Sequence, residues 1–213
     1  LLTDCGWDPS WDALRAARDD EPGARVARVT EQDRDRWQVQ LERGAAVARI
    51  AGAFEGPIPV TGDWVVLHPG PMPADPWSLV GVLPRRTAVS RGSAGEGATE
   101  QVLAANIDVV WIVQPLDVAP NLRSIERYLA VALESGAVPA LVLTKADCCP
   151  DVAAATAAIA AVAVGVTIHI VSVDDPDRIT QLRATLRPGW TVALLGQVHV
   201  DQHPRRRDPN GHG

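Results

Sequence analysis

The sequence has a single lysine, few cysteines and no long apolar run. Lysine and arginine together number 20, and Lys145 is the only lysine, so chemistry that needs this residue has one possible position. The three cysteines, Cys5, Cys148 and Cys149, include no C-x-x-C spacing, which argues against a disulfide framework and a structural zinc site. No apolar run approaches the ~20 residues of a membrane span. Neither a signal peptide nor a membrane partner is predicted, and a cytoplasmic location is expected.

The overall composition is that of an ordinary globular protein. Hydrophobic residues make up 46% of the chain, charged residues make up 22%, and the formal net charge is −6. This balance excludes disordered, collagen-like and coiled-coil chains. No segment carries the strong basic excess that by itself indicates nucleic-acid binding. The length of 213 residues is sufficient for one or two domains.

Short runs with a two-residue period follow an N-terminal segment, residues 1–20. Between residues 21 and 90, Trp37, Val39 and Leu41 alternate with polar residues, as in a half-buried strand. Similar runs, separated by turns rich in glycine and proline, occur at 24–29, 45–54, 60–67 and 77–86. We therefore predict a five-stranded OB-fold over residues 21–90. An SH3-like barrel fits the same periodicity.

The pattern changes after residues 91–99, a Gly/Ser-rich stretch that is predicted to be a flexible linker. From residue 100 to 196, apolar runs typical of buried parallel strands alternate with segments of helical period. This alternation predicts a parallel sheet covered by helices. The expected strands are 108–117, 138–147, 166–173 and 190–196. The polar tail, residues 197–213, has neither period and is expected to be disordered.

The motif Thr144-Lys145-Ala146-Asp147 closes the second apolar strand, at the carboxyl end where α/β sheets bind ligands. A carboxylate at Asp147 can accept hydrogen bonds from N1–H and the exocyclic amino group of guanine, a donor pair that adenine lacks. The aliphatic part of Lys145 would lie along the purine face. The Thr144 hydroxyl would tie this loop to its neighbours.

The next strand ends at Ser172 and Val173, where a guanine site needs a backbone N–H directed at O6 of the base. This second strand end favours guanine recognition over the alternative, a solvent-exposed turn that contains a Lys–Asp pair.

A phosphate-binding loop of the form G-x-x-x-x-G-K-[ST] is absent from the 213 residues. The apolar strand that ends at Gly196 resembles the strand that leads into such a loop, so Gly196 is its expected first residue. Counted from there, the second glycine, the lysine and the hydroxyl residue would fall on Asp201, Gln202 and His203, and none of these can serve.

The order of these features resembles the circularly permuted GTPases of the ribosome small-subunit-dependent type (RsgA/YjeQ), in which the base-specificity motif precedes the phosphate loop. The resemblance covers about residues 22–196. Its further motifs are GDW (62–64), LPRR (83–86), NLRSIERYL (121–129) and TVALLG (191–196). It implies an OB-like barrel followed by an incomplete, circularly permuted GTPase domain over residues 100–196. The switch regions and the C-terminal zinc module of the family are not matched.

By this resemblance, intact relatives bind GTP or GDP with Mg²⁺, hydrolyse GTP on the small ribosomal subunit and act in its maturation. The barrel would contact rRNA, and the arginines that the resemblance makes candidates for this are Arg25, Arg28, Arg34, Arg36, Arg49, Arg85 and Arg86. Phosphoryl transfer depends on a phosphate loop, Mg²⁺ and switch residues. We therefore expect weak guanine-nucleotide binding, no hydrolysis, and no catalytic residue in these 213 residues.

The residues after Gly196 suggest a shifted reading frame. The codon families of residues 196–203, read one nucleotide forward, permit G-K-S-T-L-I-N, the second half of a phosphate loop and the start of its helix. We therefore expect a short deletion at Gly196, with truncation of the family pattern there, and the coding DNA tests this. Two alternatives stay open: a non-enzymatic RNA-binding barrel with a vestigial GTPase domain, or an inactive frameshifted product.

Overall fold

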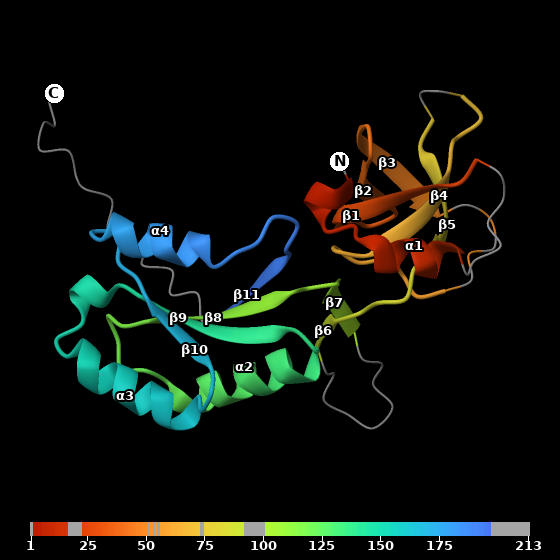
Figure 1. The fold of residues 1–213 in the computed structure, drawn as a ribbon. Coiled ribbons are helices and arrows are strands. Elements are labelled where there is room, and N and C mark those ends of the chain that lie inside the picture. The colour runs from red at the N-terminus through yellow and green to blue at the C-terminus, as the bar shows by residue number, and fades with distance from the viewer. Residues whose placement is uncertain are drawn as a thin grey trace, which may run out of the picture.

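A barrel and a parallel α/β unit follow one another along the chain (Figure 1). This computed structural model describes residues 2–16, 23–50, 52, 54, 56–72, 75–91 and 101–196. The predicted tail and all of the predicted linker except Arg91 lie outside the described residues, so both stay predictions. Arg91 itself is the last residue of a strand.

The barrel is closed by five strands in the order β1-β2-β3-β5-β4. Neighbouring strands are antiparallel, except for the parallel pair β3–β5. The strands are β1 (Arg25–Asp33), β2 (Arg36–Leu41), β3 (Gly44–Ile50), β4 (Trp64–His68) and β5 (Trp77–Val82). The expected alternation is confirmed in β2, where Trp37 and Val39 are buried in the barrel core and Gln38 is exposed. The predicted five-stranded OB-like barrel is therefore confirmed.

A short N-terminal segment covers one outer face of this barrel. It contains the 3₁₀-helix η1 (Leu2–Cys5) and the helix α1 (Pro9–Ala16). Trp11 is buried, and Trp7 meets Trp64 of β4 edge to face with 4.8 Å between the ring centroids. Aromatic contacts of this kind bury large apolar areas. The N-terminal segment is therefore an integral part of the barrel's outer core.

A two-stranded antiparallel ribbon leads from the barrel into the α/β unit. Its strands are β6 (Ala88–Arg91) and β7 (Gln101–Ala105). The Ala105 N–H donates to the Thr61 carbonyl at 3.0 Å, which attaches the ribbon to the loop before β4.

The α/β unit is a parallel sheet in the order β10-β9-β8-β11. Its elements are β8 (Val109–Pro115), α2 (Leu122–Glu134), β9 (Val138–Thr144), the 3₁₀-helix η2 (Ala146–Cys148), α3 (Val152–Val162), β10 (Thr167–Ile170), α4 (Pro176–Ala184) and β11 (Val192–Gly196). Helices α2 and α3 lie on one face of the sheet and α4 lies on the other (Figure 1). The predicted parallel sheet is confirmed.

The core of this unit lies mainly between the sheet and helices α2 and α3. Ile112 of β8, Ile125 of α2 and Ile159 of α3 are buried there. Leu182 of α4 packs on the opposite face. Asn121 caps the start of α2, because its side chain accepts a hydrogen bond from the Ser124 N–H.

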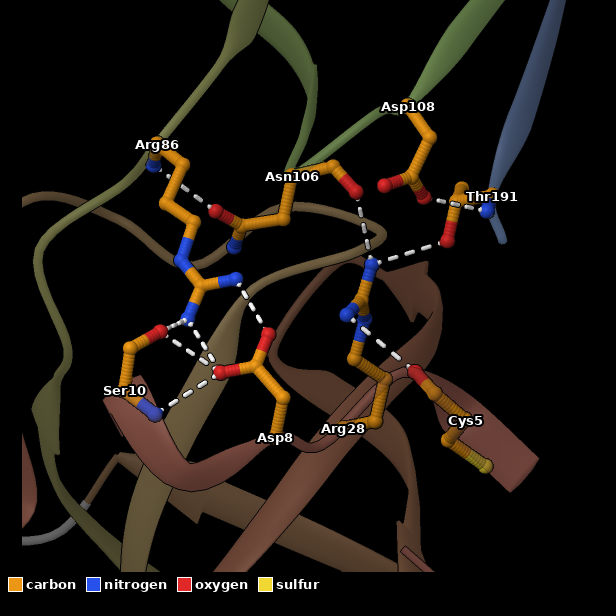
Figure 2. A network of polar contacts seen from close by, with 8 residues as sticks. All are labelled: Cys5, Asp8, Ser10, Arg28, Arg86, Asn106, Asp108 and Thr191. Atoms are coloured by element: carbon orange, nitrogen blue, oxygen red, sulfur yellow. Dashed lines mark hydrogen bonds and ion pairs between the residues drawn. The ribbon is translucent and has the colours of Figure 1, made fainter. Parts of the chain in front are cut away.

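Arg28 of β1 joins the barrel to the sheet (Figure 2). Its side chain is buried and donates to the Asn106 carbonyl and to Thr191 Oγ1, both at 3.0 Å, and to the Cys5 carbonyl at 3.3 Å. The guanidinium carbon also lies 4.9 Å from the ring centroid of Trp64. Burial lowers the pKa of Arg28 from its ordinary value. One side chain thus connects the N-terminal segment, the barrel and the sheet.

Thr191 links Arg28 to two strands of the sheet. Its N–H donates to Oδ2 of Asp108 at 2.7 Å, and its carbonyl accepts from the Asp108 N–H at 2.9 Å. Asp108 precedes β8 and Thr191 precedes β11. Arg28 therefore holds the amino end of the sheet, opposite the strand ends at which α/β sheets bind ligands.

The GDW and LPRR motifs meet beside this contact. Asp63 is fully buried and receives hydrogen bonds from Arg85 Nε at 2.8 Å, from Arg85 Nη2 at 2.7 Å and from the Val60 N–H at 2.8 Å. Gly62 has φ +92°, and a Cβ there would lie 2.0 Å from the Ala105 carbonyl oxygen. Glycine is therefore required where the barrel loop crosses the ribbon.

Arg86, the last residue of LPRR, binds the N-terminal segment. Its Nη1 and Nη2 donate to the two carboxylate oxygens of Asp8 at 2.7 and 2.9 Å (Figure 2). Its guanidinium carbon lies 3.9 Å from the Trp11 ring centroid. The hydrogen bond from Arg86 lowers the pKa of Asp8. The backbone N–H of Arg86 donates to Asn106 Oδ1 at 2.9 Å.

Candidate functional site

The Thr144–Asp147 motif lies at the carboxyl edge of the parallel sheet. β9 ends at Thr144, which pairs with Pro115 of β8, and the Thr144 carbonyl accepts from the Leu116 N–H at 2.9 Å. Ala146 N–H donates to the Val171 carbonyl at 3.4 Å, which connects the motif to the segment after β10. Three adjacent strand ends therefore meet around the motif. The Thr144 hydroxyl, which is expected to tie this loop to its neighbours, has no hydrogen bond to a described residue. The contact that is present runs through the Thr144 backbone.

Lys145 turns the chain away from the strand. It has φ 56° and ψ 38°, the left-handed conformation that L-residues rarely adopt. The sequence predicts strand up to residue 147, and the structure instead ends it at Thr144 because the next residue reverses the backbone direction. Lys145 Nζ lies 2.6 Å from Oδ2 of Asp117, just beyond β8. The lysine side chain therefore lies across the sheet edge, from β9 toward β8.

Asp147 is exposed, and its carboxylate has two hydrogen-bond donors in the structure. The Ser172 hydroxyl donates to Oδ1, and the Cys148 thiol donates to Oδ2 at 3.1 Å. The hydrogen bond from Ser172 is the main cause that lowers the pKa of Asp147. The same contact with Asp147 raises the pKa of the Cys148 thiol. The carboxylate is consequently ionised at neutral pH, the form that accepts N–H donors.

The second predicted strand end lies beside this carboxylate. Ser172 is buried, and Val173 is exposed. The Asp174 N–H donates to Ser172 Oγ at 3.1 Å, whereas the Val173 N–H donates to no group among the residues described. The backbone donor that a guanine O6 would need is therefore available.

Gly196 ends β11 at the same edge and pairs with Val113 of β8. A Cβ at this position would lie 2.5 Å from the Val113 carbonyl oxygen, so the close approach of the two strands requires glycine. The residues that follow Gly196 lie outside the described part of the chain. The residues of the predicted base site and the predicted start of a phosphate loop thus belong to one edge, with β8 between them.

Two residues at this edge were missed from the sequence. Asp117 is separated from Lys145 by 28 positions, and only the parallel pairing of β8 and β9 brings them together. Cys148 immediately follows the motif and contacts Asp147 through its thiol. The position of Asp117 at the end of an apolar run, as in the motif itself, is the one signal that could have indicated it.

The seven predicted rRNA-binding arginines do not form one surface. Arg25, Arg34 and Arg36 are exposed at the two ends of β1 and at the start of β2. The side chain of Arg28 is held in the contact between barrel and sheet. Arg49 is half-buried, and its Nε is buried. Arg85 binds Asp63, and Arg86 binds Asp8. Exposure leaves the first three accessible to a polyanion.

The described residues contain neither a metal-binding cluster nor a membrane-spanning helix. In these ranges no group of three or more His, Cys, Asp or Glu side chains is placed to hold a metal ion. Within the same ranges, no helix is both long and apolar enough to cross a membrane.

The fold is shared with solved structures of other proteins. A closed five-stranded barrel followed by a parallel sheet is shared with the solved structure of YjeQ from Thermotoga maritima, at a TM-score of 0.65 and 18% identity over 83% of this chain and 61% of that one. It is also shared with YloQ, described as a circularly permuted GTPase, at a TM-score of 0.62 and 17% identity over 86% and 63%. The fold is therefore that of the circularly permuted GTPases.

Sequence comparison identifies the family. The family model "RsgA GTPase" matches residues 82–200, more than half of the chain. A Lactiplantibacillus plantarum protein named small ribosomal subunit biogenesis GTPase RsgA 2 is 36% identical over 88% of this chain and 54% of its own length. Proteins named small ribosomal subunit biogenesis GTPase RsgA from Methanosarcina acetivorans and Streptomyces coelicolor are 37% and 39% identical, over 90% and 92% of this chain and 53% and 54% of theirs. The chain belongs to the RsgA GTPase family, and it spans about half the length of these relatives.

Proposed function

We propose that the sheet edge around Asp147 recognises the base of guanine nucleotides. The observation that carries this proposal is the Asp147 carboxylate, which Ser172 holds at the carboxyl edge of a parallel sheet beside an available Val173 N–H. Guanine offers two N–H donors to the carboxylate and its O6 to the backbone donor. Adenine would leave the carboxylate without its donors, which opposes its binding.

The role of each residue follows from its place at the edge. Asp147 reads the N1–H and the amino group, Val173 reads O6 through its backbone, and the Lys145 stem contacts the purine face. Thr144 and Ala146 hold the turn through their backbone contacts to Leu116 and Val171. Gly196 would lead toward the phosphates.

An exchange of base specificity tests this proposal. In Asp147→Asn the side chain amide donates as well as accepts, so it complements xanthine, whose C2 carbonyl replaces the amino group of guanine. We expect wild-type protein to prefer GDP over XDP and Asp147→Asn to reverse the preference, each by at least about tenfold, a difference of ~1.4 kcal/mol. Nuclear magnetic resonance titration with millimolar nucleotide measures both. Asp174→Asn, an exposed carboxylate at the same edge, is the control; an unchanged preference in Asp147→Asn would refute the proposal.

We further propose that the 213-residue chain does not hydrolyse GTP above background. In GTPases of this kind a phosphate-loop lysine contacts the β- and γ-phosphates, and a Ser or Thr of that loop holds Mg²⁺. The 213 residues have one lysine, Lys145, and contain no such loop. They therefore lack the loop lysine for the phosphates and the loop hydroxyl that would hold Mg²⁺. Phosphate release is the measurement, with and without small ribosomal subunits. Turnover stimulated by the subunits would contradict the expectation.

We propose small ribosomal subunit maturation in the cytoplasm as the process and rRNA as the partner of the barrel. The names of the three relatives support the process. The exposed Arg25, Arg34 and Arg36 supply cations for phosphate contacts. Arg34→Gln with Arg36→Gln should weaken binding to a small-subunit rRNA fragment and reduce its salt dependence. Arg123→Gln, which replaces an exposed arginine of helix α2, is the control, and equal binding by both variants would contradict the role of the barrel.

A further inference from the structure

The only lysine of the chain is paired with a carboxylate that lies on the neighbouring strand. Lys145 follows β9 and Asp117 follows β8, and the two parallel strands are in register as far as the Pro115–Thr144 pair. Nζ lies 2.6 Å from Oδ2, and the two side chains are 35% and 23% exposed. The pair is therefore partly shielded from water at the mouth of the sheet.

The backbone at Lys145 fixes the direction in which this side chain leaves the strand. Its left-handed conformation is rarely adopted by residues other than glycine, and strain of this kind persists where the surrounding structure determines it. The Ala146 N–H, bonded to the Val171 carbonyl, fixes the turn from the other side. The chain direction and the ion pair thus both place the lysine stem along the sheet edge.

We propose that Asp117 is a positioning residue for base recognition. It holds the ammonium of Lys145 over β8, so that the methylene stem between the two strands is in place to contact a purine face while Asp147 reads the edge of the base. This inference rests on the guanine-recognition function proposed above. A stem that is already ordered loses less conformational freedom when the base binds, which strengthens binding.

The Lys145–Asp117 ion pair has no net charge. In the strand order β9-β8-β11, Asp117 lies between the base-reading residues and the strand that ends at Gly196. An unpaired carboxylate there would repel nucleotide phosphates, and the Lys145 ammonium neutralises it. An asparagine at position 117 would keep an oxygen acceptor for the ammonium without the charge.

The solitary lysine makes the experiment selective. The full chain labelled with [¹⁵N]lysine gives one lysine amide signal, and this signal reports on position 145 alone. Guanosine and adenosine are each titrated into wild type, Asp117→Ala, Asp117→Asn and the control Asp174→Ala. The urea unfolding midpoint of each protein is measured in parallel. Guanosine carries no phosphate, so the titration isolates base recognition.

We expect Asp117→Ala to shift the Lys145 signal and to weaken guanosine binding about three- to tenfold without a matching fall in the unfolding midpoint. Asp117→Asn should restore most of the affinity, and Asp174→Ala should behave as wild type. A guanosine preference that is intact in wild type and equal in Asp117→Ala overturns this inference alone. A loss in Asp117→Ala that Asp117→Asn fails to restore also overturns it. No preference for guanosine over adenosine in wild type overturns the proposed function, and this inference with it.

Discussion

Arg28 on the first barrel strand donates a 3.0 Å hydrogen bond to Oγ1 of Thr191, the residue that precedes the last strand of the sheet. The two residues are 163 positions apart. Because the same guanidinium also binds the Asn106 carbonyl, the barrel is fixed to the amino ends of the strands whose other ends carry the candidate site.

Replacement of Arg28 tests how much this contact stabilises the fold. Arg28→Ala should lower the free energy of unfolding by about 2–4 kcal/mol, because it leaves the buried Asn106 carbonyl and the part-buried Thr191 hydroxyl without their donor and removes the contact with Trp64. Urea denaturation followed by tryptophan fluorescence is the measurement. Arg25→Ala, an exposed arginine of the same strand, should cost no more than about 0.5 kcal/mol. Equal effects of the two variants would contradict the structural role of Arg28.

Asp63 and Arg85 offer a second test, because their ion pair is largely removed from water. Their side chains are 0% and 16% exposed. Asp63→Ala should destabilise the protein by about 3–5 kcal/mol, since it leaves the Arg85 guanidinium and the Val60 N–H without their acceptor. Asp8→Ala, which breaks the exposed pair with Arg86, should cost at most about 1 kcal/mol. Similar unfolding midpoints for Asp63→Ala and Asp8→Ala would contradict this expectation.

The parts of the structure that follow local periodicity could be predicted from the sequence. Trp37 and Val39 alternate with polar residues because one face of β2 is buried in the barrel. The strand-end position of Asp147 follows from the apolar run before it. In both cases a short stretch of sequence determines the burial pattern.

The parts that depend on contacts between distant segments could not be predicted. The resemblance makes Arg28 a candidate for rRNA contact, which needs an accessible side chain, and an arginine on an outward strand face is normally solvated. In the structure that face is covered by the N-terminal segment, with Trp11 packed beside Val26. Asp117 was missed for the same reason, since its partner Lys145 is on another strand.

Gly62 combines a left-handed backbone conformation with a close contact that leaves no room for a side chain. Its φ is +92°, and a Cβ would lie 2.0 Å from the Ala105 carbonyl oxygen, so Gly62→Ala should destabilise the protein by about 3 kcal/mol or more. Gly165 has a similar φ of +77° with no atom near the added Cβ, and Gly165→Ala should cost only ~1–2 kcal/mol. Chemical denaturation compares them. Similar losses for both would mean that the conformation, and not the Ala105 contact, requires glycine at position 62.

The pH dependence of base binding should report on the contact between Ser172 and Asp147. The Ser172 hydroxyl lowers the pKa of Asp147, so the carboxylate stays ionised as the pH falls below the ordinary aspartate value of ~3.9, and guanosine binding is lost only when the pH falls through the lowered pKa. Ser172→Ala removes this donor, so the Asp147 pKa should rise and the loss of binding should begin at a higher pH. Carboxyl ¹³C titration of Asp147 and guanosine affinity are measured on the same samples, with circular dichroism to verify that the protein stays folded. Identical pH profiles for wild type and Ser172→Ala would show that Ser172 does not hold Asp147 in its ionised form.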